Sequence, residues 1–262
     1  MRKTGKGRTG GLLTVTVELE FSLDHQGHGL ESQFDKVVAR LIEQFRTRQI
    51  VATWSVADPA VSSASSLIRS AHPDNEIAIL GDRSWIGTGA GRERFSRELR
   101  RRMERAKCVG IPCSTLVVRQ PEFGGNLDLL AAAGVDAIVR HAGGDAVSSP
   151  SATLVYSGLV GVTSSLRLPI LRWWDGSHGT RRALRMLREI STRTEEMHLT
   201  LDAAQIARRK GRSIHAIGRF LDRVVELRQV GHVETLTVRG FKEMRLSEFE
   251  RRRFHSILRP AA

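Results

Sequence analysis

The chain has 262 residues, of which 40% are hydrophobic and 26% charged, with a formal net charge of +13. This ordinary globular composition excludes a disordered chain, a collagen-like chain and a coiled coil. The apolar runs are shorter than the roughly 18 residues that a membrane span needs, and two cysteines cannot supply a disulfide framework. We therefore expect a soluble cytoplasmic protein without a membrane span.

Strand-like and helix-like patterns alternate from one end of the chain to the other. Apolar residues recur at every second position in the predicted strands and at helical spacing in the predicted helices. In chain order we predict strand 12–21, helix 34–45, strand 50–56, helix 61–71, strand 76–80, helix 92–107, strand 115–119, helix 126–133, strands 137–139, 153–155 and 166–168, helix 180–190, strand 197–201, helix 214–225, strand 234–238 and helix 247–257.

This alternation predicts parallel strands that are joined by helical crossovers. A (β/α) barrel, complete or distorted, fits a chain of about 250 residues, and a doubly wound open sheet is the alternative. No change in composition marks a domain boundary. We therefore expect a basic, flexible N-terminus over residues 1–11 and a single barrel domain over residues 12–262.

Two acidic residues end the first predicted strand. Alternation places Glu18 and Glu20 on one face, where two carboxylates can bind a metal or raise the pKa of one of them for general-base catalysis. A polar rim without chemistry is the alternative. Other catalytic patterns are weak: residues 87–91 lack the spacing of a dinucleotide-binding loop, and the one close histidine pair is His25 and His28.

Three stretches resemble a known family. Residues 15–21 (VTVELEF) form a strand that ends in acids, residues 50–56 (IVATWSV) precede a helix and NEIA at 75–78, and residues 119–124 read RQPEFG. Together they resemble the polysaccharide deacetylases, the NodB-type carbohydrate esterases. A weaker piece, MHLTLD at 197–202, falls where that family has a late L-x-L-x-H strand.

The resemblance implies a distorted (β/α) barrel that removes acetyl groups from sugars with the help of a divalent metal. In that family an Asp acts as base on a metal-bound water, a second Asp and two His hold the metal, and a late His protonates the leaving amine. Here the two metal His positions fall on Leu80 and Ser84. Leucine cannot bind a metal, and a serine hydroxyl is a poor ligand beside imidazole. The usual metal site is therefore expected to be missing.

The remaining family positions suggest the candidate site residues. The first Asp position falls on Glu18 and the second on Leu19, or on Glu20 if the V-D-V-E variant of the motif applies; the late His position falls on Asp202, and Arg119 is retained. We predict Glu18 as base, Asp202 as acid and Arg119 as partner of a carboxylate or oxyanion. Glu20 is the predicted metal ligand. No cofactor is expected; the alternative is a hard divalent cation held by carboxylates.

Three further residues are predicted to bind substrate. Asp82 follows the strand 76–80, and Trp173 and Trp174 follow the strand 166–168. Aromatic rings at the mouth of a barrel can stack on a sugar ring, although packing in the core is the alternative. The expected partner is a carbohydrate or glycan precursor, and the sequence leaves the oligomeric state open.

Three hypotheses on function follow. The first is a deacetylase-like barrel in glycan metabolism whose metal site is degenerate, which makes it a pseudoenzyme. The second is an active, divergent deacetylase. The third is an arginine-rich protein that binds nucleic acid or an anionic surface, supported by the eight basic and three acidic residues of 92–107. Interleaved Arg and Glu are also typical of a solvent-facing helix, so a nucleic acid partner is not expected.

Overall fold

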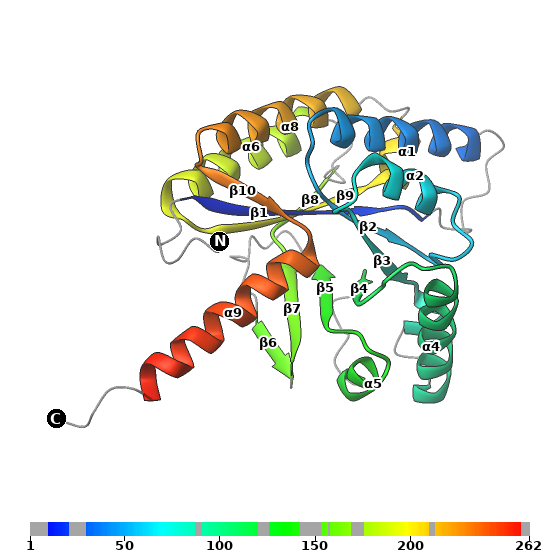
Figure 1. Ribbon diagram of the computed structural model, residues 1–262. Helices are drawn as coiled ribbons and strands as arrows, with labels where there is room; N and C mark the ends of the chain where they lie inside the picture. The colour runs from blue at the N-terminus through cyan, green and yellow to red at the C-terminus, as the bar shows by residue number, and fades with distance from the viewer. Residues whose placement is uncertain are drawn as a thin grey trace.

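The computed structural model describes residues 10–20, 30–86, 91–119, 126–141, 153–156, 158–168, 176–209 and 213–257. Its strands are β1 (Gly11–Glu18), β2 (Thr53–Val56), β3 (Glu76–Gly81), β4 (Thr115–Val118), β5 (Ala137–His141), β6 (Thr153–Tyr156), β7 (Leu159–Ser164), β8 (Leu166–Leu168), β9 (Glu196–Asp202) and β10 (Val233–Leu236). Its helices are α1 (Leu30–Thr47), α2 (Ala64–Ala71), α3 (Arg83–Ile86), α4 (Arg92–Cys108), α5 (Leu127–Ala132), α6 (Gly176–Arg193), α7 (Ala203–Arg208), α8 (Ser213–Gln229) and α9 (Val238–Ile257) (Figure 1).

The strands form a nearly closed barrel. From β5 the sheet runs through β4, β3, β2 and β1 to β9 and β8, all in parallel pairings, and β5 also pairs with β7. Only Ser165 separates β7 from β8, so this stretch of chain joins the two ends of the ring. The structure thus confirms the predicted distorted (β/α) barrel, with eight parallel strands in the ring, and not the open-sheet alternative.

The distortion lies at β1. One edge of β1 pairs with β9 from Leu12 to Glu18. Its other edge is shared, because β10 pairs with the first half of β1 and β2 pairs with Thr16–Glu18. The chain then leaves β10 directly into α9, which crosses beneath the amino-terminal end of the barrel (Figure 1).

A buried carboxylate fixes the start of α9. Glu76 accepts hydrogen bonds from the Thr53 hydroxyl at 2.8 Å, from the Thr115 hydroxyl, and from the backbone N–H of Arg239 at 2.9 Å. The backbone N–H of Val238 donates to the Thr53 hydroxyl at 2.8 Å. An acidic group near the first turn of a helix also suits the helix dipole.

Alternation along the strands separates two cores. On β1, Leu13, Val15 and Val17 point outward into the cluster that packs against α1, α6 and α8. Leu12 faces inward, into an apolar layer that Val238 and Phe241 of α9 close at the amino-terminal end of the barrel. Toward the carboxyl end the buried inner positions become polar: Thr14, Thr16, Glu18, Ser55, Thr200 and Asp202. The barrel therefore has an apolar base and a polar mouth.

Some predicted elements were wrong in detail. Val238 begins α9 instead of ending a strand, and this helix starts well before the predicted residue 247, because its first turn is held by Thr53 and Glu76. The sequence missed β7, where Gly161 interrupts the apolar pattern, and the short helices α3 and α7. None of the described helices has the length and hydropathy of a membrane span.

Candidate functional site

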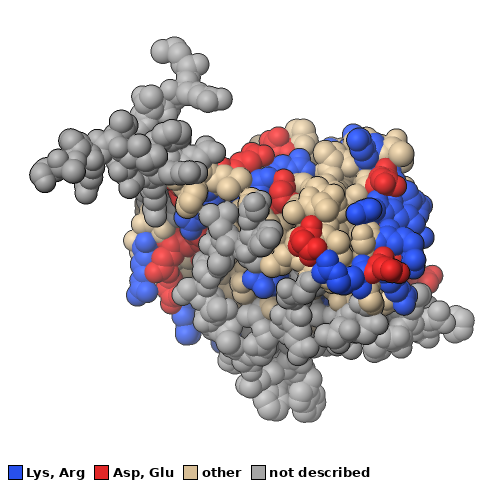
Figure 2. Space-filling view, turned by 90° about the horizontal axis from the view of Figure 1, so that it is seen from below, with Lys and Arg blue, Asp and Glu red and all other residues tan. Residues whose placement is uncertain are grey.

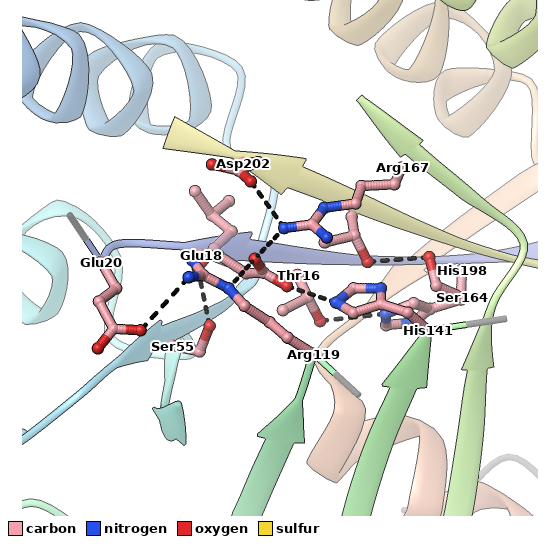
Figure 3. Close-up of polar contacts among 12 residues, drawn as sticks. Thr16, Glu18, Glu20, Ser55, Arg119, His141, Ser164, Arg167, His198 and Asp202 are labelled. Atoms are coloured by element: carbon pink, nitrogen blue, oxygen red, sulfur yellow. Dashed lines mark hydrogen bonds and ion pairs between the residues drawn. The ribbon is translucent and has the colours of Figure 1, made fainter. Parts of the chain in front are cut away.

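Ionisable residues from five strands meet at the carboxyl end of the barrel (Figure 3). Glu18 ends β1, His141 ends β5 and Asp202 ends β9, while Arg119 follows β4 and Arg167 lies in β8. Parallel strands bring their carboxyl ends to the same face, which is where (β/α) barrels carry their sites. We call these five residues the mouth network.

Glu18 is the centre of the mouth network. Its side chain is fully buried and accepts hydrogen bonds from Arg119 Nε at 2.9 Å, Arg167 Nη2 at 2.8 Å and His141 Nε2 at 2.6 Å. An unpaired charge in such a position would be very costly, and these three donors compensate for the lost hydration.

Arg167 bridges two acids. Its Nη2 atom lies 2.8 Å from Oε2 of Glu18 and 2.6 Å from Oδ2 of Asp202. The other oxygen of Asp202 accepts a hydrogen bond from the backbone N–H of Gln205 at 2.9 Å, at the start of α7. Both oxygens of Asp202 are therefore engaged.

The two acids at the end of β1 have opposite pKa shifts. Burial raises the pKa of Glu18, but the hydrogen bond from His141 and the charges of Arg167 and Arg119 outweigh it and lower the pKa to about 2. Burial and the neighbouring Asp82 raise the pKa of Glu20, against the charge of Arg119. Glu18 is thus a permanent anion and a weak base, and Glu20 is the acid of this pair that takes up a proton more readily.

The structure brings together most of the predicted site residues. Glu18, Arg119 and Asp202 belong to the mouth network, and Glu20 Oε2 lies 3.5 Å from Arg119 Nη1. Asp82 lies at the end of β3, where it accepts a hydrogen bond from the backbone N–H of Ser84 at 2.6 Å. The predicted stacking residues Trp173 and Trp174 lie outside the described residues.

The sequence missed Arg167 and His141. His141 lies two residues beyond the predicted strand 137–139, and Arg167 is the middle residue of the predicted strand 166–168. The carboxyl ends of parallel strands meet at one face of a barrel. Listing every polar residue at or near a predicted strand end could therefore have found both residues.

The mouth does not fit the metal site that the family resemblance implies. Leu80 is buried among the apolar side chains of the barrel, and Ser84 lies in α3. Among the residues that the structure describes, no group of three or more His, Cys, Asp or Glu side chains could hold a metal ion. The Glu18 carboxylate is already held by two guanidinium groups, which stay charged at any physiological pH.

A second histidine lies deeper in the barrel. His198 is buried, with Nδ1 2.6 Å from the Thr14 hydroxyl and Nε2 3.1 Å from the Thr16 hydroxyl. Burial, helped by the charge of His141, lowers the pKa of His198 to about 3. This imidazole is therefore neutral near pH 7, and it separates the charged mouth from the apolar base.

Comparison with known proteins gives structural matches alone: no family model and no curated protein matches the sequence. A solved structure described as a polysaccharide deacetylase from Mycobacterium smegmatis superposes with a TM-score of 0.69 at 18% identity, over 94% of this chain and 93% of that chain. A second structure described as a polysaccharide deacetylase, from Pseudomonas aeruginosa, has a TM-score of 0.54 at 14% identity, over 81% and 84%.

A 4-alpha-glucanotransferase from Thermococcus litoralis is also similar, with a TM-score of 0.59 at 12% identity, over 87% of this chain but 39% of that longer chain. Identities this low establish architecture and not activity. The chain therefore has the distorted (β/α)-barrel fold of the polysaccharide deacetylases.

Proposed function

We propose that this protein binds a carbohydrate or glycan precursor at the mouth of its barrel, within glycan metabolism, and that it is a pseudoenzyme with respect to metal-dependent deacetylation. Carbohydrate is supported by the fold, because the solved structures that share it include proteins named for polysaccharides and for glucan transfer. A shared fold supports a shared ligand class only by analogy, and the mouth network supplies the chemical support.

The observation that carries the proposal is the saturation of Glu18 by Arg119, Arg167 and His141. A metal-dependent hydrolase needs an open coordination position and a means of making hydroxide near neutral pH. Here guanidinium groups hold the central carboxylate, and its pKa of about 2 makes it a poor base. The site is consequently better suited to binding than to metal-assisted hydrolysis.

The rest of the mouth offers both hydrogen-bond acceptors and hydrogen-bond donors. Glu20 and Asp82 supply acceptors, and Arg119 and Arg167 supply charged donors. Sugar hydroxyls donate and accept hydrogen bonds at once, so a mixed set of this kind suits them. Trp173 and Trp174 are proposed as stacking partners for the sugar ring.

Titration calorimetry with acetylated and deacetylated chitooligosaccharides, and with soluble peptidoglycan fragments, tests the proposal. We expect one sugar class to bind without added metal, and binding to weaken at least about tenfold in the Glu20→Ala/Asp82→Ala variant. Asp222→Ala is the matched control, because Asp222 is an exposed acid that pairs with Arg48 on another face. Failure of all sugars, or equal affinity in the two variants, would overturn the proposal.

An active metal-free deacetylase is the second candidate, and the raised pKa of Glu20 favours it. An acid with a raised pKa can exchange a proton with substrate closer to neutral pH. Its side chain is 16% exposed at the mouth, whereas Glu18 is enclosed. Release of acetate from acetylated sugars, lost in Glu20→Gln and kept in Asp222→Asn, would support this candidate. Equal acetate release by wild type and Glu20→Gln would reject it.

The basic surface gives weaker support for an anionic partner. Figure 2 shows Lys and Arg gathered toward one edge of the molecule, with Asp and Glu among them. On α4, Arg92, Arg101 and Arg105 pair with Asp128, Glu98 and Asp58. Binding to duplex DNA that falls steeply with salt would revive this interpretation.

A further inference from the structure

We propose that the guanidinium group of Arg167 occupies a cation position between Glu18 and Asp202, and that replacing Arg167 by a neutral residue creates a site for a divalent metal. This inference concerns cation binding alone. It does not depend on whether the mouth binds carbohydrate.

The first support is the position of the two acids. Glu18 and Asp202 are register partners on the neighbouring parallel strands β1 and β9, and both are buried. Two carboxylates held side by side in a buried place repel each other unless a cation lies between them. The backbone pairing keeps the two residues side by side, and a cation between their carboxylates relieves the repulsion.

The second support is the contact of Arg167 with both carboxylates. A single atom, Nη2, contacts an oxygen of each acid, at 2.8 Å and 2.6 Å. Of the two arginines on Glu18, only Arg167 is hydrogen-bonded to Asp202; Arg119 contacts Glu18 through Nε and Glu20 through Nη1. Arg167 is therefore the cation that bridges Glu18 and Asp202, whereas Arg119 links Glu18 to Glu20 through two different nitrogens.

The third support is the nearby imidazole. His141 Nε2 lies 2.6 Å from the other oxygen of Glu18, while its Nδ1 is buried and has no hydrogen-bond partner within the described part of the chain. Two carboxylates and an imidazole form a donor set that suits Zn²⁺, Co²⁺ or Mn²⁺. With Arg167 in place its guanidinium stands between the two carboxylates, and among the described residues no group of three or more His, Cys, Asp or Glu side chains is placed to hold a metal ion.

Direct metal titration tests the inference. Wild-type protein and Arg167→Ala, both stripped of metal, are titrated with Zn²⁺ and Mn²⁺ by calorimetry, and their thermal unfolding is followed with and without metal. We expect one equivalent to bind Arg167→Ala at least about tenfold more tightly than wild type, and metal to raise the Tm of the variant alone. The double variant Glu18→Gln/Arg167→Ala should lose both effects.

The chain offers a matched control in Arg245. This arginine also lies between two acids, Glu196 and Glu248, and its side chain is 34% exposed, against 32% for Arg167. Glu248 is itself 36% exposed, however, whereas Glu18 and Asp202 are both buried. Arg245→Ala should gain no metal affinity. Arg167→Lys keeps the positive charge and should gain none either.

Three results would overturn the inference. They are tight binding of metal by wild type, equal gain in Arg245→Ala, and absence of metal binding by a folded Arg167→Ala. If Arg167→Ala does not fold, Arg167→Gln replaces it, because glutamine fills more of the same space without a charge. Arg167→Gln should then show the same gain in metal affinity.

Discussion

The Nε2 atom of His141 lies 2.6 Å from Oε1 of Glu18, although 123 residues separate the two in the chain. This hydrogen bond links β5 to β1 across the inside of the barrel. It gives Glu18 a third donor besides its two arginines, and it is the largest of the effects that lower the pKa of Glu18. The mouth network is therefore a stabilising element of the barrel as well as a candidate site.

The first prediction concerns the acid stability that Glu18 provides. Its pKa falls from 4.5 to about 2 on folding, so the stabilisation is complete above pH 4.5 and is lost as the pH falls toward 2. A shift of this size corresponds to roughly 3 kcal/mol. In urea unfolding, the difference in stability between wild type and Glu18→Gln should shrink by this amount as the pH falls from 4.5 to 2.

Glu18→Gln also leaves two guanidinium groups without their anion. We expect its free energy of unfolding at pH 7 to be lower by about 3 to 5 kcal/mol. A variant that matches wild type in both stability and acid sensitivity would contradict the geometry of the mouth network.

The second prediction uses His198. Folding lowers the pKa of His198 from 6.5 to about 3. Below pH 6.5, His198 is protonated in the unfolded chain but stays neutral in the folded protein. The free energy of unfolding therefore falls as the pH falls from 6.5 toward 3. Between pH 6.5 and 4.5 the loss of stability from His198 is roughly 3 kcal/mol. As the pH falls, it occurs before the loss from Glu18. His198→Gln should flatten this range in urea unfolding, and the control His215→Gln, at an exposed position of α8, should not.

The third prediction concerns the attachment of α9. Glu76→Ala removes the acceptor for the hydroxyls of Thr53 and Thr115 and for the N–H of Arg239. Leaving buried donors unpaired and opening a cavity should cost about 3 kcal/mol or more. Hydrogen exchange should rise in the first turn of α9. Glu43→Ala, which breaks an exposed pair with Arg46, should leave the free energy of unfolding nearly unchanged, because exposed ion pairs contribute little. Similar losses in both variants would argue against the proposed anchor.

The fourth prediction concerns the two thiols. Cys108 is exposed, whereas Cys113 is partly buried, and burial together with the charge of Glu76 raises the pKa of the Cys113 thiol to about 12. Only about one Cys113 in ten thousand is therefore a thiolate at pH 8, and the thiolate is the reactive form. A disulfide reagent should label Cys108 quickly in the folded protein and Cys113 only slowly. Equal rates, measured on the two single Cys→Ser variants, would contradict this.

The sequence predicted the barrel because the fold depends on local patterns. Alternation along β1 and helical spacing along α1 are visible in short windows, and the resulting order of strands and helices leaves few topologies. The same reasoning placed Glu18 at the end of a strand, and the family resemblance added Arg119 and Asp202. These three residues do meet in the structure.

The rest of the site depends on contacts between distant parts of the chain. The donors to Glu18 come from positions 101, 123 and 149 residues away. Arg167 lies inside the barrel because β8 pairs with β9, directly after β7 has paired with β5. The sequence did not predict β7, because Gly161 interrupts its apolar pattern. The pKa of Glu18 follows from those contacts, so it could not be read from the end of one strand.

The last prediction tests how closely the helical layer packs on the barrel. A Cβ added at Gly11, the first residue of β1, would lie 2.3 Å from the backbone oxygen of Ile190 in α6. Since backbone must move to accept it, Gly11→Ala should lower the free energy of unfolding by about 3 kcal/mol or more. Gly91→Ala is the control: Gly91 has φ −58°, and none of the described residues places an atom within 4 Å of an added Cβ. The free energy of unfolding of this variant should stay within about 1 kcal/mol of wild type. If urea unfolding finds the two variants equally stable, α6 does not approach β1 as closely as the structure shows.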